Sequence, residues 1–420
     1  MNSFKDKINQ VGLQAKEASK ILAKISTIQK NEALLAMADH ILNDKELILE
    51  ANKIDIKQAK AKGLSESFVD RLQLNEERVE SISATLREIE SFRDPIGRVL
   101  DSWTRPNGLN ISRVSTPLGT IGVIYESRPN VTADAGALCL KSGNASILRG
   151  GSDSIHSCVA IHKSMTKGLN DVGITEHAIQ IIEDKNREAV NMMLQGINKC
   201  IDIIVPRGGR GLVTQVEKEA RVPIFAHLEG ICHIYIDKDA DLNKAINVCV
   251  NAKMRRPGIC GAVETIFVHS EIAKICLPDL VNAFSAKDCE IRGCKETQKF
   301  SENIIAASDE DWRTEYLLPI VSIKVIKDFD EALTHIDIYS SGHTESIITE
   351  NMNTAARFQN ELDSAIVMHN TSTQFADGGE FGLGGEIGIA TGKFHARGPV
   401  GVEQLTSFKY IVSGDGQIRD

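Results

Sequence analysis

One loop of the 420-residue chain carries the residue types of a nucleophilic site. Cys260 follows a Pro257-Gly258 turn and precedes a strand-like apolar run at 263–268. Three cationic residues come shortly before it: Lys253, Arg255 and Arg256. A thiol attacks as the thiolate, and nearby cations or backbone N–H groups lower its pKa. Cys260 is therefore a candidate nucleophile, although free cysteines are also common as inert residues of a core.

Two glycine-rich loops combine arginine with the start of a helix. They occupy residues 149–153 (RGGSD) and 207–211 (RGGRG). Glycine lets backbone N–H groups approach an anion, while arginine and a helix N-terminus favour negative charge. Neither loop has the spacing GxGxxG, and glycine-rich turns also occur without a ligand. Together the two loops predict a phosphate-bearing cofactor, with Arg149, Gly208 and Gly209 as its candidate contacts.

Recurring strand–loop–helix units would position these loops. The first set of short apolar strands is predicted at 119–125, 145–148, 178–182 and 201–205, with helices at 131–141, 186–194 and 212–220. The second set is predicted at 233–236, 265–269, 319–326, 346–349 and 364–368, with helices at 242–253, 272–285 and 329–335. This alternation is typical of parallel sheets covered by helices on both faces. The polar loop 126–130 follows the first strand, where such sheets hold ligand groups.

The remaining segments predict supporting structure. Residues 4–95 favour packing helices, with one apolar stripe running from Ile21 to Ile41 and a later helix at 76–89 that Asn75 could cap. The helix after RGGSD would be capped by Ser152 or Asp153. Two further segments, 107–117 and 406–411, read as exposed strands. The glycine-rich stretch 376–392 is interleaved with apolar residues, which favours an ordered lining loop over a flexible linker.

Composition excludes several function classes. The chain is 42% hydrophobic and 25% charged, with a formal net charge of −9 and no basic block, which argues against a nucleic-acid or membrane-surface role. Nine cysteines are scattered without a CxxC pair, so we expect reduced thiols in a reducing compartment and no structural metal. The N-terminus lacks the apolar core of a signal peptide, which favours the cytoplasm.

The order of these motifs resembles that of the aldehyde dehydrogenase superfamily. The similarity is carried by the strand and loop 117-PLGTIGVIYESRPN-130, the turn in 141-KSGNASILRGGSD-153, the glutamate of 227-HLEG-230 and the loop cysteine. Further segments resemble its γ-glutamyl phosphate reductase branch: 204-IVPRGGRGL-212, 231-ICHIYID-237, 251-NAKMRRPGICGAVET-265, 340-SSGHTESI-347 and 376-ADGGEFGLGGEIGIATGKFHARGPVGVEQLTSFKY-410. The resemblance covers nearly the whole chain.

The resemblance implies an aldehyde dehydrogenase-like α/β fold in three parts. A Rossmann-like NADP-binding domain would occupy residues 1–106 and 118–230, and an α/β catalytic domain residues 231–395. A small β oligomerisation arm would comprise residues 107–117 and 396–420. The arm leads us to expect a homo-oligomer, a dimer or tetramer. The composition leads us to expect no nucleic-acid or membrane partner.

The implied activity is the NADPH-dependent reduction of a small molecule, L-glutamyl 5-phosphate, to L-glutamate 5-semialdehyde and phosphate in proline biosynthesis. Cys260 would form a thioester, which accepts hydride far better than a carboxylate does. Its backbone N–H and a side chain from Arg128 or Asn130 would hold the tetrahedral oxyanion. Arg128 stands where hydrolytic relatives carry asparagine, so the choice between these two side chains stays open. Gly261 follows the cysteine where the family often has asparagine.

Further roles are implied for four residues near the nucleophile. Glu229 would tune Cys260 or shuttle protons, and a purely structural acid is the alternative. Arg255 and Arg256 would bind the acyl phosphate or the α-carboxylate of the substrate through bidentate guanidinium contacts, or else remain solvated. Glu315 resembles the glutamate that holds the nicotinamide ribose. The preference for NADPH over NADH rests on the resemblance alone.

The sequence leaves two competing functions open. A hydrolytic aldehyde dehydrogenase would release a free acid, and Arg128 in place of asparagine argues against it. A non-catalytic member of the fold would have lost its nucleophile or its glycine loops, and both are present here. In the segment SGHTESI, His343 and Glu345 are expected to shape the catalytic domain.

Overall fold

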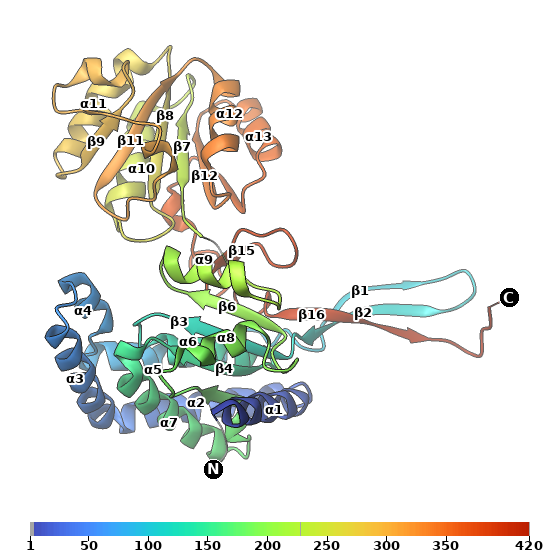
Figure 1. The fold of residues 1–420 in the computed structure, drawn as a ribbon. Coiled ribbons are helices and arrows are strands. Elements are labelled where there is room, and N and C mark those ends of the chain that lie inside the picture. Colours follow the sequence, from blue (N-terminus) through green and yellow to red (C-terminus); the bar gives the residue numbers. More distant parts are fainter. Residues whose placement is uncertain (1–3, 227, 420) are drawn as a thin grey trace. The chain divides into compact units, whose positions relative to one another are not determined.

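The computed structural model describes residues 4–226 and 228–419. His227, part of one family segment quoted above, lies outside the described residues. The chain divides into two units: residues 1–226, 382–388 and 400–420 form unit 1, and residues 227–381 and 389–399 form unit 2. Each unit contains its own parallel sheet flanked by helices, which confirms the predicted α/β fold class (Figure 1).

Unit 1 is built on a four-stranded parallel sheet in the order β5-β4-β3-β6. Its strands are β3 (Thr120–Tyr125), β4 (Ala145–Gly150), β5 (Ile179–Ile181) and β6 (Ile203–Arg207). Their helices are α6 (Val131–Lys141), α7 (Ile155–Asp171), α8 (Arg187–Leu194) and α9 (Arg210–Glu219). Right-handed crossovers place α6 and α7 on one face, because β3, β4 and β5 follow one another in one direction. The return step to β6 places α8 on the other face. Ile224 bridges to Ile204 in parallel beyond β6, so α9 lies on the same face as α8.

Residues 4–95 are mostly helical, as the sequence predicts, and the described part of this segment contains five helices. They are α1 (Phe4–Leu22), α2 (Thr27–Asn43), α3 (Lys45–Ala61), α4 (Glu66–Leu72) and α5 (Glu76–Ser91). The prediction of one continuous apolar stripe is wrong at its start, since α1 ends at Leu22 and a Ser26 cap begins α2. Ile21 and Ile28 flank this break and lie exposed.

Side-chain capping confirms one predicted helix start and corrects another. The side chain of Asn75 accepts a hydrogen bond from Arg78 N at 2.8 Å, which caps α5 as predicted. The predicted caps Ser152 and Asp153 instead belong to a 3₁₀ turn (Ser152–Ser154), and α7 begins after it without a side-chain cap. Asp153 forms an ion pair at 2.5 Å with Lys62, which follows α3 and is far away in sequence.

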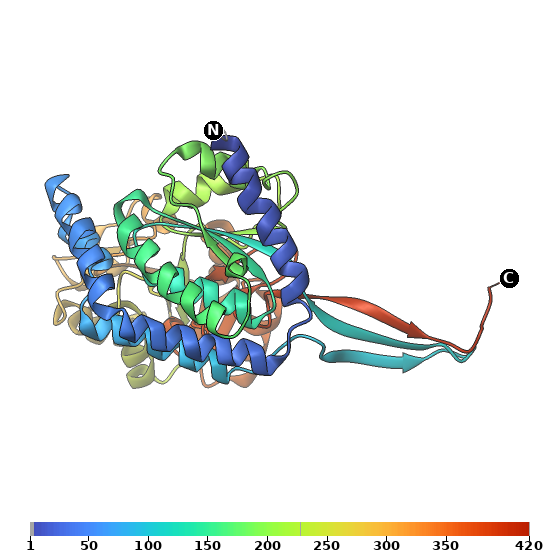
Figure 2. The ribbon, with the colours of Figure 1, turned by 90° about the horizontal axis from the view of Figure 1, so that it is seen from below.

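A three-stranded antiparallel sheet extends from unit 1 as an arm (Figures 1 and 2). It contains β1 (Val99–Thr104), β2 (Asn110–Pro117) and β16 (Thr406–Ser413), in the order β1-β2-β16. The two segments that the sequence singled out as exposed strands thus pair with each other within one chain. β1 was not predicted. Large apolar side chains on the arm are exposed, among them Tyr410 at 57% and Val412 at 55%.

Unit 2 contains a seven-stranded parallel sheet in the order β10-β9-β11-β8-β7-β12-β13. The strands are β7 (Cys232–Ile236), β8 (Val263–His269), β9 (Glu290–Gly293), β10 (Ile305–Ala306), β11 (Ile320–Ile326), β12 (Thr344–Ile348) and β13 (Ile366–His369). The helices are α10 (Leu242–Met254), α11 (Ala273–Ser285), α12 (Phe329–Tyr339) and α13 (Met352–Glu361).

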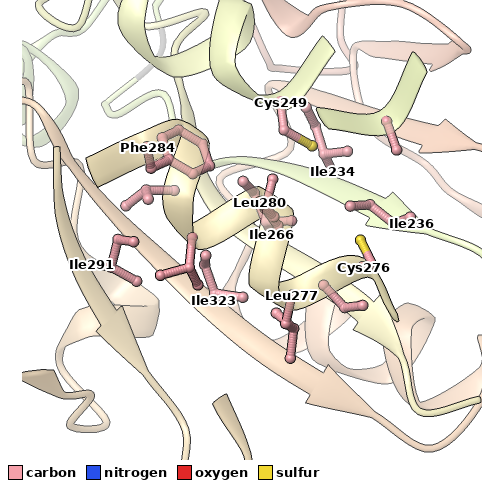
Figure 3. Packing of buried hydrophobic residues seen from close by; sticks show 14 of the residues in the cluster. Ile234, Ile236, Cys249, Ile266, Cys276, Leu277, Leu280, Phe284, Ile291 and Ile323 are labelled. Atoms are coloured by element: carbon pink, nitrogen blue, oxygen red, sulfur yellow. The ribbon is translucent and has the colours of Figure 1, made fainter. Parts of the chain in front are cut away.

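Alternating side chains of the central strands bury both faces of this sheet. Ile234 and Ile236 of β7 pack with α10 and α11 in one apolar cluster (Figure 3). The residue between them, Tyr235, packs with α12 and α13 on the opposite face. This period-two pattern explains why β7 and β8 are buried along their whole length. The strands therefore give the loops at their ends a rigid support.

The glycine-rich stretch after residue 375 contains two short strands, β14 (Ile389–Ala390) and β15 (Gly398–Pro399), which pair with each other. Over residues 4–226 and 228–419, no helix combines the length and apolar character needed to cross a membrane. The same residues contain no group of three or more His, Cys, Asp or Glu side chains arranged to hold a metal ion.

Candidate active site

The predicted site residues fall into two sets, one in each unit. Unit 1 holds Arg128, Asn130, Arg149, Gly208 and Gly209, and unit 2 holds Glu229, Arg255, Arg256, Cys260 and Glu315. Within each unit the structure identifies the neighbours that support these residues.

Cys260 lies in the turn that joins α10 to β8. The turn begins at the predicted Pro257-Gly258 pair and is closed by a 3.0 Å hydrogen bond from Ala262 N to Ile259 O. Cys260 and Cys294 are half-buried, whereas the other cysteines of the chain are buried. A buried helix end and a buried strand thus hold a partly accessible thiol between them.

A second cysteine supports the main chain of Cys260. The Cys232 thiol, on the first residue of β7, donates a hydrogen bond to the carbonyl oxygen of Cys260 at 3.1 Å. Burial raises the pKa of Cys232 well above its usual range, so this group remains a thiol and keeps its proton for donation. His343 Nδ1 lies 3.5 Å from the Cys232 sulfur, and the His343 side chain is fully buried. His343 therefore lies inside unit 2, next to the thiol that supports the Cys260 loop.

Gly230 lies close to the main chain of Cys260. A Cβ atom at this position would lie 2.0 Å from the Cys260 carbonyl oxygen, so only glycine fits here without displacement of the main chain. Gly230 N donates a 3.0 Å hydrogen bond to Glu315 Oε1. The predicted residue Glu315 is thereby fixed to the segment that carries Glu229, which is half-buried.

The side chain of Gln374 forms hydrogen bonds with three residues that precede the cysteine turn. Its Nε2 donates to the carbonyl oxygens of Ala252 at 2.9 Å and Arg256 at 3.2 Å, and its Oε1 accepts from Arg255 Nη1 at 3.3 Å. Gln374 is buried, whereas Arg255 and Arg256 are exposed. A buried amide therefore fixes the backbone while leaving most of both guanidinium groups accessible to an anion.

A buried ion pair joins the two elements on either side of the Cys260 turn. Lys253 in the last turn of α10 and Glu264 near the start of β8 are both fully buried, with Nζ and Oε2 2.5 Å apart. Burial raises the pKa of Glu264, and the nearby ammonium opposes that shift. The Lys253 ammonium also lies 5.6 Å from the centre of the Tyr316 ring, next to Glu315. The two ends of the cysteine loop are therefore joined by a charge pair.

The second glycine loop of unit 1 already accommodates an anionic group. Gly209 caps α9, and its N–H donates to Glu126 Oε2 at 2.8 Å. A Cβ atom on Gly208 would lie 2.7 Å from Glu126 Cδ, so the glycine lets the carboxylate approach the backbone closely. A carboxylate placed against N–H groups at a helix N-terminus has the electrostatics expected of a phosphate site.

The other candidate residues of unit 1 are Asn130, Arg128 and Arg149, and they differ in burial and contacts. Asn130 Nδ2 donates to Asp134 Oδ2 at 2.8 Å, and burial raises the pKa of Asp134 to about 6. Arg128 is half-buried at the start of α6. Arg149, by contrast, turns its guanidinium inward, where it is buried and donates to the carbonyl of Gly150. Burial lowers the pKa of Arg149.

Comparison with known proteins assigns the chain to a family. The model of the aldehyde dehydrogenase family matches residues 2–293 and 303–411. The γ-glutamyl phosphate reductase of Allorhizobium ampelinum is 58% identical over 409 residues, which cover 97% of this chain and 96% of that protein. The chain belongs to the γ-glutamyl phosphate reductases of the aldehyde dehydrogenase family. The γ-glutamyl phosphate reductase of Brucella suis is 57% identical over 98% of this chain and 97% of its own length.

The crystal structure of a γ-glutamyl phosphate reductase from Thermotoga maritima agrees with this family. It shares 44% sequence identity, with a TM-score of 0.97 over 99% of this chain and 100% of that one. The resemblance inferred from sequence is thus confirmed. Four residues that contact the candidate site residues or their loops carry no sequence signal of that role: Cys232, Glu264, Gln374 and Glu126. Gly230 was visible in the family segment, but its contact with Cys260 was not.

Proposed function

We propose that this chain reduces L-glutamyl 5-phosphate to L-glutamate 5-semialdehyde and phosphate with NADPH, as a step of proline biosynthesis. The observation that carries the proposal is the supported, half-buried thiol of Cys260 in a member of the γ-glutamyl phosphate reductases.

Covalent catalysis by Cys260 accounts for the bond changes. The thiolate attacks the acyl carbonyl carbon, a C–S bond forms, and the C–O bond to phosphate breaks with release of inorganic phosphate. NADPH, when bound, supplies the hydride that reduces the resulting thioester. The C–S bond of the reduced adduct then breaks, which releases the aldehyde and regenerates the thiolate. The Cys260 N–H, with Arg128 or Asn130, would stabilise the oxyanion formed in both stages.

The residues of unit 1 fit a phosphate-bearing cofactor. The N–H of Gly209 already donates to a carboxylate at the start of α9, and a phosphate presents the same kind of acceptor. A phosphate of NADPH would therefore take the place of the Glu126 carboxylate at Gly208 and Gly209. Arg149 is buried at the end of β4 and would add its positive charge from there. Glu315 of unit 2 would hold the nicotinamide ribose.

The remaining predicted residues of unit 2 would act on the substrate. Arg255 and Arg256 are exposed beside the cysteine turn, where guanidinium groups can bind a phosphate or carboxylate through paired hydrogen bonds. Glu229 would move a proton to or from the Cys260 thiol. Water must be kept from the thioester, because its attack would waste the activated acyl group.

We also propose that the arm mediates a homo-oligomer. β16 is an outer strand of a three-stranded sheet, and such an edge presents unpaired N–H and C=O groups. Its exposed side chains include Phe408, Tyr410 and Val412. Sedimentation of the purified chain should give a dimer or tetramer, and a monomer at micromolar concentration would contradict this proposal.

The reverse reaction tests the function directly. Glutamate 5-semialdehyde and NADP⁺ are supplied with and without inorganic phosphate, and NADPH formation is followed by its absorbance. We expect strict dependence on phosphate, because phosphate must resolve the thioester. Equal rates without phosphate would instead show hydrolysis by water. Cys260→Ala should be inactive, and Cys294→Ala, which changes the other half-buried cysteine, should retain activity.

A further inference from the structure

Unit 1 contains a hollow that the proposed reaction does not use. It lies between α3 and α7, is bordered by the segment after β5 and has a volume of about 590 Å³. Pockets that bind small molecules usually measure about 300–1,000 Å³ and are mostly apolar with a few placed polar groups. This hollow lies against α7, on the sheet face opposite α8 and α9, so it is separate from the glycine loop that begins α9. On the α7 side its lining begins at Ile155, two residues after the other glycine loop at 149–153, so competition with NADP⁺ decides whether the two sites overlap.

The α3 wall presents an apolar stripe to this hollow. Leu47, Ala51 and Ile54 recur at helical spacing along one side of α3, and all three line the hollow. Leu47 is 59% exposed and Ile54 is 47% exposed. The residues of α3 that pack inward form a different stripe, which includes Ile48 and Ala59. Val159 and Ala160 extend the apolar lining on the α7 side.

The rim of the hollow carries an excess of positive charge. Three lysines line it, Lys163, Lys167 and Lys185, against two acidic residues, Asp44 and Glu183. Asp44 is already engaged, since Lys167 Nζ lies 2.7 Å from one carboxylate oxygen and Ser164 Oγ donates to it at 2.8 Å. Neither Lys163 nor Lys185 forms an ion pair with any other residue that the structure describes. In a chain with a net charge of −9, this local sign favours an anion.

The imidazole of His156, in the wall of the hollow, is held in a fixed orientation. His156 Nδ1 lies 2.7 Å from Asp55 Oδ1, and Asp55 is buried. Asp55 Oδ2 also accepts from the backbone N–H and hydroxyl of Ser157, at 2.8 and 2.6 Å. These bonds fix the carboxylate and leave the other ring nitrogen of His156 to a ligand. The hollow thus combines an apolar wall, an oriented imidazole and two lysines without ion-pair partners among the described residues.

We propose that the hollow between α3 and α7 binds a small anionic molecule with an apolar body. The apolar part lies on Leu47 and Ile54, and the carboxylate, sulfonate or phosphate group meets Lys163 and Lys185. This site shares no lining residue with those proposed to bind substrate or cofactor, and it does not depend on the proposed function.

Anilinonaphthalene sulfonate, an aromatic anion, is the probe that tests the site. The full-length protein is titrated and followed by fluorescence, with saturating non-fluorescent NADP⁺ present throughout. We expect a saturable class of one site per chain that NADP⁺ does not displace. In Leu47→Ser this class should weaken by about tenfold, the loss expected when most of one buried leucine contact is removed. Lys163→Glu should weaken it in a salt-dependent manner.

Matched surface variants in unit 2 serve as controls. The exposed fraction of Ile275, 60%, nearly equals that of Leu47. Lys274 is an exposed lysine on the same helix as Ile275, α11. Ile275→Ser and Lys274→Glu should leave the titration unchanged. The proposal is overturned if NADP⁺ displaces the probe, if no saturable class exists, or if the unit 2 variants weaken binding as much as Leu47→Ser does. Unchanged binding in Leu47→Ser and Lys163→Glu would overturn it as well.

Discussion

The Cys232 thiol donates a hydrogen bond to the carbonyl oxygen of Cys260, with 3.1 Å between the two atoms. The two residues belong to neighbouring parallel strands and their loops, since β7 pairs with β8. The main chain of Cys260, the proposed nucleophile, is therefore held by a thiol that burial keeps protonated. This relationship makes Cys232 a positioning residue, and its removal has a measurable consequence.

Cys232→Ala should lower kcat by about fivefold to tenfold, because a neutral hydrogen bond contributes ~1 kcal/mol. KM for NADPH should not change, since the bond supports only the thiol loop. Cys232→Ser restores a donor and should recover part of the lost kcat. The control is Cys276→Ala, which removes another buried thiol in α11. Equal losses in Cys232→Ala and Cys276→Ala would show that the effect is general destabilisation.

Gly230→Ala should disable the site while leaving the fold intact. The added Cβ would fall 2.0 Å from the Cys260 carbonyl oxygen. Because Cβ is bonded directly to Cα and the carbonyl is main chain, the two backbone segments must move apart. A displacement of this kind can cost about 100-fold in kcat/KM, and the overpacking should lower the free energy of unfolding by ~1–3 kcal/mol. Gly392→Ala adds a methyl group where no atom lies within 4 Å and should be silent. Full activity of Gly230→Ala would contradict the close approach.

The Lys253–Glu264 pair should show strong coupling in a double-mutant cycle. Lys253→Met leaves an unpaired buried carboxylate and should destabilise the protein by about 3–5 kcal/mol in urea unfolding. Glu264→Leu leaves an unpaired buried ammonium and should behave similarly. The double variant Lys253→Met/Glu264→Leu removes both charges and should recover most of the stability. Additive losses in the double variant would mean that the two charges do not act as a pair.

His335 should make unit 2 sensitive to mild acid. Burial, assisted by the nearby charge of Lys324, lowers the pKa of His335 to about 3, whereas an unfolded histidine titrates near 6.5. Below about pH 6.5 the unfolded chain binds a proton that the folded chain does not, so the free energy of unfolding falls as pH drops. The slope approaches ~1.4 kcal/mol per pH unit and ends near pH 3.

His335→Phe provides the control for this pH dependence. The imidazole lies among aromatic rings, with its centroid 4.9 Å from Phe267 and 5.4 Å from Trp312, so a phenyl ring suits the site. Urea unfolding of both proteins between pH 5 and pH 7 should show a shallower slope for the variant. Parallel slopes would assign the acid sensitivity to other groups.

Thiol reactivity should single out Cys260. Burial raises the pKa of Cys276 to about 11 and that of Cys289 to about 12, so these thiols should react slowly with iodoacetamide. Limited alkylation followed by peptide mass mapping should find Cys260 modified first, and the loss of activity should follow its modification. Faster labelling of any buried cysteine would contradict this order.

Local sequence determined the elements and their order. The short apolar runs that became β3, β7 and β8, and the Asn75 cap of α5, depend on neighbours a few residues away, so spacing and residue type reveal them. The Pro257-Gly258 pair is also a local signal, and it predicted that Cys260 lies on a loop. The predicted start of α7 was wrong because Asp153 pairs with Lys62, a partner that no local pattern indicates.

Only the tertiary structure decided what surrounds Cys260. Cys232 and Cys260 are 28 residues apart, and Gln374 reaches the carbonyl of Ala252 across 122 residues. Parallel strands bring such residues together through crossovers, and no local pattern marks which cysteine or glutamine will make the contact. A hydrogen bond, a steric limit or a buried charge pair depends on distances between distant segments. The sequence therefore determined the elements and the presence of the thiol, whereas packing determined the groups that hold it in place.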